Sequence, residues 1–316
     1  MPPFCIYVIV SEGCKDFKTQ VGIQTMGAHN VVRITILKIF ASTLLLTCLL
    51  TAHATESATS IEIGIAPFLP IQTLVKNYGP LRKYLQHQLH ENVTIISAPD
   101  YRTFYKRIEQ HTYPVIITPA NSAYLAWHDS AYVPLLRPLA NTQPVVVVAK
   151  DQPFSYLSDL RGKTVAMPDA LAIVSMQGLQ MLRDAGLKTG YDFTLKNMQN
   201  HRVAVNFVIA GEADAAIVSD RAIMQMPDSV RAQIKIVYTW KNGAAPGVVY
   251  LGSPKLSQDK LKLIKKSILE FAQNTPEGIK LMHELGYVGL ESIAEDGLKS
   301  LAPYGNMLKT ALDENK

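Results

Sequence analysis

The tripeptide Gly162-Lys163-Thr164 has the residue types that end a phosphate-binding loop, in which backbone amides and a lysine surround the phosphates of a nucleotide. That loop requires a glycine five residues before Gly162, and this sequence has Leu157 there, so we reject the motif. His87 and His90 fit the solvated end of a helix better than a metal pair. The sequence contains neither a G-x-S-x-G nor an H-E-x-x-H motif. We therefore expect no enzyme activity, no metal and no cofactor.

The segment that begins at Met26 has the layout of an export signal. It carries Arg33 and Lys38, then the apolar run 39–50, and then Ala52-His53-Ala54, a small-x-small cleavage pattern. The apolar run is shorter than the roughly 20 residues that a membrane-spanning helix needs. We predict a signal peptide over residues 26–54 and a mature chain from Thr55. Residues 1–25 are then an extended leader or follow an unused start, so both Met1 and Met26 stay open as the first residue.

All three cysteines lie within the first 54 residues, at Cys5, Cys14 and Cys48. A chain that starts at Thr55 has none, which excludes thiol nucleophiles, disulfides and cysteine-ligated metals from the mature protein. Leu45-Leu46-Thr47-Cys48 loosely resembles a lipidation site, but Thr47 is a poor residue before the cysteine. We expect a periplasmic protein, with a lipoprotein as the less favoured alternative.

The composition limits both the architecture and the partners. The 316 residues, of which 48% are hydrophobic, are enough for about two globular domains. The 31 Lys and Arg against 26 Asp and Glu give a net charge of +5, without the dense basic runs that neutralise nucleic-acid phosphates. We expect no nucleic-acid partner.

Short apolar, β-branched segments alternate with stretches of helical periodicity, which is typical of an α/β protein. We predict strands over 61–66, 93–97, 115–118, 145–149, 163–167, 193–195, 215–218, 234–238 and 248–251. We predict helices over 74–89, 101–110, 171–185 and 203–211, and one that begins near Ser122. Gly79-Pro80 should kink or split the first helix, and Asn121 should cap the helix at Ser122.

This order predicts two lobes. Residues 55–145 and 247–316 would form lobe 1, and residues 146–246 would form an inserted lobe 2, with residues 1–54 as leader and signal peptide. Two crossing strands would act as the hinge. Ligands in open α/β sheets bind outside the carboxyl ends of the strands, so these ends should face each other across a cleft. Thr118 and Asn121 follow one such strand and are candidate ligand-binding residues.

Several blocks of sequence then carry a family resemblance across residues 60–305. They are Tyr78-Gly79-Pro80-Leu81, Ala98-Pro99-Asp100-Tyr101, the segment 119–124, Leu160-Arg161-Gly162-Lys163-Thr164-Val165-Ala166 and Gly211-Glu212-Ala213-Asp214-Ala215-Ala216. Their order and spacing resemble the phosphonate/phosphite-type periplasmic solute-binding proteins of ABC transporters. The resemblance implies a type II periplasmic binding protein fold, with two lobes that are each a mixed sheet flanked by helices. It also implies a protein, which we expect to be a monomer, that closes on a small oxyanion and delivers it to a membrane permease.

The resemblance also implies site residues. Tyr101 matches a ligand-facing tyrosine, His201 stands where the family has a ligand histidine, and Ser219-Asp220 falls where the family has a polar residue. Protonation of His201 would strengthen its attraction to an anion, so affinity should fall as the pH rises. In place of the family's Ser/Thr-rich phosphonate cradle, this chain has Asp169-Ala170-Leu171-Ala172-Ile173-Val174-Ser175, which leaves the ligand open. Asp169 is a further candidate.

Each candidate also has a structural alternative. Asp169 and Asn121 could cap helices, Tyr101 could staple the helix that follows Asp100, and His201 could be a capping or exposed residue. Two other functions stay open for the chain: a ligand-sensing subunit of a membrane signalling system, and an enzyme on the same fold that resembles a pyrimidine-precursor synthase. The lack of a visible pair of nucleophile and base disfavours the enzyme.

Overall fold

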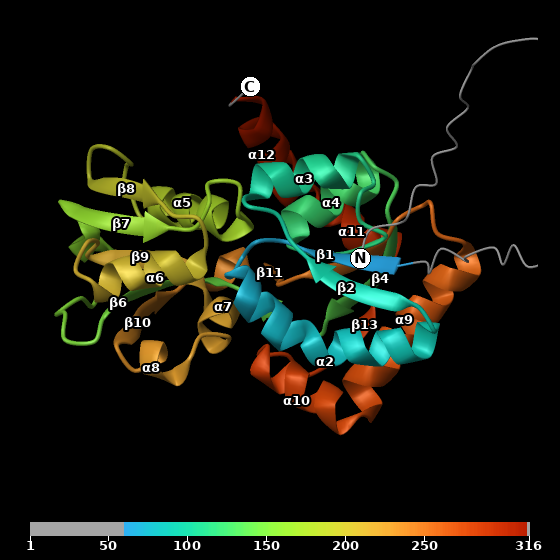
Figure 1. The fold of residues 1–316 in the computed structure, drawn as a ribbon. Coiled ribbons are helices and arrows are strands. Elements are labelled where there is room, and N and C mark those ends of the chain that lie inside the picture. The colour runs from blue at the N-terminus through green and yellow to red at the C-terminus, as the bar shows by residue number, and fades with distance from the viewer. Residues whose placement is uncertain (1–59, 315–316) are drawn as a thin grey trace, which may run out of the picture. The chain divides into compact units, whose positions relative to one another are not determined.

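The computed structural model describes residues 60–314. The predicted signal peptide, its cleavage site and Cys48 lie outside the described residues. Two β-sheets with helices packed against them make up a mixed α/β fold, as the α/β alternation of the sequence predicts (Figure 1). Within the described range, no helix has both the length and the apolar character needed to cross a membrane.

The first sheet has six strands in the order β13-β4-β12-β3-β1-β2. These are β1 (Ser60–Ile65), β2 (Asn92–Ile96), β3 (Val115–Thr118), β4 (Val133–Pro138), β12 (Val249–Gly252) and β13 (Leu290–Ser292). Strands β2, β1 and β3 are parallel, and β12 pairs antiparallel with β3.

The second sheet has five strands in the order β10-β6-β9-β7-β8. These are β6 (Pro144–Ala149), β7 (Lys163–Met167), β8 (Phe193–Asn197), β9 (Ala215–Ser219) and β10 (Ile234–Thr239). Strands β8, β7 and β9 are parallel, and β6 pairs antiparallel with β9. A separate pair, β5 (Asn141–Thr142) with β11 (Ala245–Pro246), lies in the chain just before β6 and just before β12.

Helices connect these strands. They are α2 (Ile71–Leu89), α3 (Tyr101–Glu109), α4 (Ala120–His128), α5 (Ile173–Asp184), α6 (His201–Ile209), α7 (Asp220–Met224), α8 (Asp228–Arg231), α9 (Gln258–Asn274), α10 (Pro276–Glu284), α11 (Glu295–Lys299) and α12 (Ala302–Asp313), with the short 3-10 helices η1 (Leu157–Leu160) and η2 (Lys241–Gly243). Helices α2 and α4 pack on the first sheet, and α5 and α6 pack on the second (Figure 1).

Capping side chains fix where two of these helices begin. The carboxylate of Asp100 accepts a hydrogen bond from the backbone N–H of Thr103 at the start of α3. The amide oxygen of Asn200 accepts one from Val203 at the start of α6. Each cap satisfies an amide that has no partner inside its own helix. Tyr101 and His201 therefore occupy the same position, the first residue of a helix that follows the outer parallel strand of a sheet.

Two details of the predicted helices differ in the structure: α2 is not split at Gly79-Pro80, and Asn121 is not the N-cap of α4. Helix α2 runs from Ile71 to Leu89 without a break, although Pro80 lies inside it. Helix α4 begins at Ala120 after Pro119, so Asn121 is inside the first turn and is not its N-cap. A side chain inside the first turn is free to bond elsewhere, and that of Asn121 does so.

Candidate functional site

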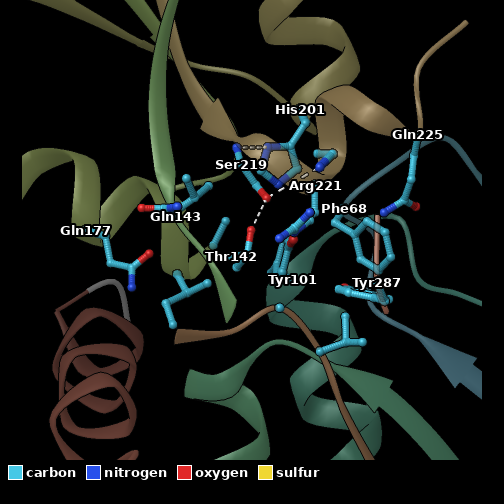
Figure 2. Close-up of a pocket in the computed structure, with 16 residues that line it drawn as sticks. Phe68, Tyr101, Thr142, Gln143, Gln177, His201, Ser219, Arg221, Gln225 and Tyr287 are labelled. Carbon is cyan, nitrogen blue, oxygen red and sulfur yellow. Dashed lines mark hydrogen bonds between the residues drawn. The ribbon is translucent and has the colours of Figure 1, made fainter. Parts of the chain in front are cut away.

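A small pocket of about 40 Å³ lies between residues that follow the strands of both sheets (Figure 2). Its lining residues are Phe68, Tyr101, Thr142, Gln143, Ala172, Ile173, Val174, Gln177, His201, Ser219, Arg221, Ala222, Gln225, Gly247, Val248 and Tyr287. A volume of this size holds a group of only a few heavy atoms, since one water needs roughly 10–15 Å³ by the same measure.

The sheet topology explains why these residues meet. Phe68 follows β1, Ala172 follows β7, and Ser219 ends β9, so all three lie at the carboxyl ends of parallel strands. The segments just before β6 and β12 contribute Gln143 and Val248. Open α/β sheets bind ligands at these ends, so the pocket is where the fold favours a ligand.

His201 has a defined tautomer. Its Nδ1 accepts a hydrogen bond from the backbone N–H of Ser219 at 3.2 Å, so the neutral ring carries its proton on Nε2. Only 4% of the residue is exposed, and burial lowers the pKa of His201 to about 3. The ring is therefore neutral near pH 7 and offers one N–H donor. A neutral ring does not fit the expectation that a protonated His201 attracts the anion.

Two tyrosines add neutral donors to the pocket wall. Burial raises the pKa of Tyr101, and the nearby Asp169 carboxylate raises it further. Burial also raises the pKa of Tyr287, against the opposing effect of Arg221. Both phenols therefore keep their protons at neutral pH and can donate to a ligand oxygen.

Arg221 supplies the positive charge of the pocket wall. Among the described residues that line the pocket, it is the only side chain with a charge at neutral pH. Its Nη1 donates to the sulfur of Met224 at 3.5 Å and its Nη2 donates to the carbonyl of Asn141 at 3.3 Å. Its buried Nε has no hydrogen-bond partner within the described part of the chain, and the same holds for the buried Oε1 of Gln225.

Asp220 holds this side of the pocket in place from just outside the wall. Its Oδ1 accepts the Thr142 hydroxyl at 2.5 Å and the backbone N–H groups of Gln143 at 3.1 Å and Arg221 at 2.7 Å. The Ser219 and Thr142 hydroxyl oxygens are 2.6 Å apart. Because Thr142 gives its one proton to Asp220, Ser219 must donate to Thr142. Both hydroxyl protons are therefore used within the protein.

Part of the pocket wall is apolar. Ala172, Ile173 and Val174 line it at the start of α5, and no side chain caps this helix. The positive end of the helix favours an anion, but no hydroxyl reaches the ligand position from these three residues. Ser175, the one hydroxyl of the segment 169–175, donates to the carbonyl of Pro168.

Comparison with known proteins identifies the family. The family described as "ABC transporter, phosphonate, periplasmic substrate-binding protein" matches residues 63–298, which is most of the chain. The chain belongs to this family. Members of the phosphonate-binding family are periplasmic substrate-binding proteins of ABC transporters and are not enzymes.

Solved structures confirm the two-lobed type II periplasmic binding protein fold. A binding protein component of an ABC phosphonate transporter from Pseudomonas aeruginosa has a TM-score of 0.69 at 16% identity, over 81% of this chain and 89% of that one. PhnD1 from Prochlorococcus marinus, in complex with methylphosphonate, has a TM-score of 0.70 at 13% identity, over 80% and 99%. The alkanesulfonate-binding protein SsuA from Xanthomonas axonopodis pv. citri, bound to MOPS, has a TM-score of 0.57 at 15% identity, over 81% and 94%.

The candidate residues of this phosphonate-binding family member divide into two groups. Tyr101, His201 and Ser219 line the pocket, whereas Thr118, Asn121, Asp169 and Asp220 do not. Contact of any of them with a ligand stays a prediction.

Of the residues outside the wall, Asn121, Asp169 and Asp220 have structural hydrogen bonds, whereas the buried hydroxyl of Thr118 has no partner within the described part of the chain. Asn121 is fully buried, and its Nδ2 donates to the carbonyl of Leu171 at 3.0 Å, which joins α4 to the segment before α5. The carboxylate of Asp169 accepts the backbone N–H of Leu171 at 2.8 Å. Because α5 begins only at Ile173, Asp169 is not its N-cap.

The sequence analysis missed most of the polar wall, namely Thr142, Gln143, Gln177, Arg221, Gln225 and Tyr287. One signal was present, since Arg221 directly follows the Ser219-Asp220 pair that the family resemblance selects. Tyr287 comes from the loop after α10, and no sequence pattern relates that loop to the other wall residues.

Proposed function

We propose that this protein is the periplasmic receptor of an ABC importer, and that it binds a small phosphonate- or phosphite-like oxyanion and delivers it to a permease. The observation that carries the proposal is the composition of the pocket wall. Arg221, neutral His201 and the phenols of Tyr101 and Tyr287 offer N–H and O–H donors, and the described lining includes no carboxylate. Donors around a single positive charge favour an anion.

A closing cleft completes this proposal. The sequence predicts lobe 1 at residues 55–145 and 247–316 and lobe 2 at 146–246; because Pro144 and Val145 pair with β9, we place the first boundary just before β6, and the hinge at the two chain crossings beside the β5–β11 pair. The hydrogen bonds from Asn121 to Leu171 and from Gln199 to Pro99 link the two halves, which supports a closed arrangement around the pocket. We propose that the receptor acts as a monomer.

Thermal unfolding with added anions tests ligand binding. Methylphosphonate, phosphite, phosphate and methanesulfonate are compared, each at a fixed pH. A ligand at 100 times its Kd adds about 2.7 kcal/mol of stability. The proposed ligand class is wrong when neither methylphosphonate nor phosphite raises the midpoint.

Uptake by intact cells tests delivery. Cells that lack this protein should lose uptake of labelled methylphosphonate at low external concentration, and the wild-type gene should restore it. Normal uptake in those cells, with binding intact in vitro, would favour the sensory role.

The intact mass of the exported protein tests the proposed signal peptide, which predicts a chain that starts at Thr55 and has no lipid on Cys48.

A further inference from the structure

The wall of the pocket that would bind the oxyanion contains one cation and several apolar side chains. Arg221 lies on the wall with His201 and Tyr101, and Figure 2 labels all three among the side chains that line the pocket. Ile173 and Val174 belong to the apolar part of the wall. The charged and apolar parts differ in what they can bind, so they constrain the orientation of a ligand.

The guanidinium of Arg221 is held in position with donor capacity to spare. It makes hydrogen bonds to a thioether sulfur, which is a weak acceptor, and to one carbonyl. The nearest carboxylate oxygen, Oδ2 of Asp220, lies 3.8 Å from Nε, beyond hydrogen-bond distance. Gly286 packs on the side chain, and a Cβ there would lie 3.0 Å from Cδ and 3.1 Å from Nη1 of Arg221. The backbone of Gly286 has a φ of +77°, which glycine adopts without strain.

Oδ2 of Asp220 forms an ion pair with Arg221 Nε at 3.8 Å, which offsets part of the arginine's charge but leaves the buried Nε without a hydrogen-bond partner within the described part of the chain. Three donors already bind Oδ1 of Asp220, and this residue is not part of the pocket wall. Asp169, the other nearby carboxylate, is also outside the wall. An ammonium group in the pocket would find no carboxylate among the described lining residues, and a buried cation without a partner is strongly disfavoured.

We infer that Arg221 is the principal anion-binding residue of this pocket, and that it selects a small oxyanion with a short alkyl substituent and no ammonium group. The inference rests on the proposed function. The anionic group bonds to the Nε side of Arg221 and to Nε2–H of His201, and the alkyl group packs on Ile173 and Val174. Arg221 thus replaces, as the anion-binding group, the Ser/Thr-rich segment that this chain lacks.

Calorimetric titration of the purified protein with two matched ligands tests the selection. Ethylphosphonate and aminomethylphosphonate have the same number of heavy atoms and differ in the ammonium group. Ethylphosphonate should bind at least tenfold more tightly. Equal affinities, or tighter binding of aminomethylphosphonate, would overturn the exclusion of amines.

Substitution of the arginine tests its role. Arg221→Gln should weaken binding of methylphosphonate by about 10- to 100-fold, the range for a lost hydrogen bond to a charged group. Arg221→Lys should recover part of the loss, because the charge remains but the planar fork does not. Arg202→Gln is the control, since it removes the same charge from a partly exposed position on α6 that is outside the pocket.

The outcomes separate the two proposals. Wild-type affinity in Arg221→Gln, with ligand-free unfolding unchanged, would overturn the inference and leave the proposed function intact. If the wild-type protein bound methanesulfonate but not methylphosphonate, the inference about Arg221 would stand and a phosphonate would be rejected as the ligand. Failure of the wild-type protein to bind any of these anions would reject the proposed function itself.

Discussion

The buried neutral imidazole of His201 should make the protein less stable in acid. In the unfolded chain a histidine has a pKa of about 6.5, whereas burial lowers the pKa of His201 to about 3 in the folded protein. Between these values the unfolded state binds a proton that the folded state does not, so the stability falls as the pH falls below about 6.5. At pH 5.0 the loss is about 2 kcal/mol, from roughly 1.36 kcal/mol for each of the 1.5 pH units below 6.5.

Urea unfolding of the wild type and of His201→Asn at pH 7.5 and 5.0 measures this loss. The asparagine keeps an acceptor near the position of Nδ1 for the Ser219 N–H and cannot be protonated. Contributions from every other titrating group cancel in the comparison. The wild type should lose about 2 kcal/mol more unfolding free energy than His201→Asn when the pH is lowered from 7.5 to 5.0. A difference in unfolding free energy that stays constant between the two pH values would refute a depressed pKa for His201.

Substitutions at three further positions test hydrogen bonds and packing of the fold. Asp220→Ala should lower the unfolding free energy by about 3 kcal/mol in a urea titration, because three donors lose a charged acceptor, whereas Asp220→Asn should cost clearly less. Gly64→Ala should cost about 1–3 kcal/mol in the same assay, since a Cβ there would lie 2.5 Å from the Tyr113 ring, and an unchanged midpoint would contradict that contact. Asn121→Ala should cost about 1–3 kcal/mol by leaving the Leu171 carbonyl without its buried donor, and wild-type stability would show that water replaces the amide.

Most strands could be predicted because each is an apolar, β-branched run bounded by turn residues. The strands that the sequence analysis missed lack this signal. Strand β4 contains Pro134 and ends at Pro138, and prolines argue against a strand because they cannot donate to its ladder. Strand β13 has only three residues, and β5 and β11 have two each. Their pairing depends on tertiary contacts, which single-sequence patterns do not contain.

The site was predictable only where sequence spacing fixes the geometry. Tyr101 and His201 could be selected because the family resemblance fixes their positions in the sequence, and in the structure each is the first residue of a helix behind a capping residue. The neutral state of His201 could not be predicted, since it follows from burial in the folded protein. The role proposed for Arg221 depends on the short helix α7 and on a glycine from another part of the chain, Gly286.

Equivalent positions in the helices that follow the two sheets have different roles. This difference explains why the pocket wall has a single charged side chain. Asn121 and Arg221 are each the second residue of the helix that follows β3 or β9, the third parallel strand of its sheet. Asn121 uses its amide to bond to Leu171 across the two halves, so the first sheet contributes a contact that holds the halves together. Arg221 keeps donors for the pocket, so the charge comes from the second sheet alone. A second cation at position 121 would lose the bond to Leu171 and would be buried without a partner, because that position is fully buried and outside the pocket.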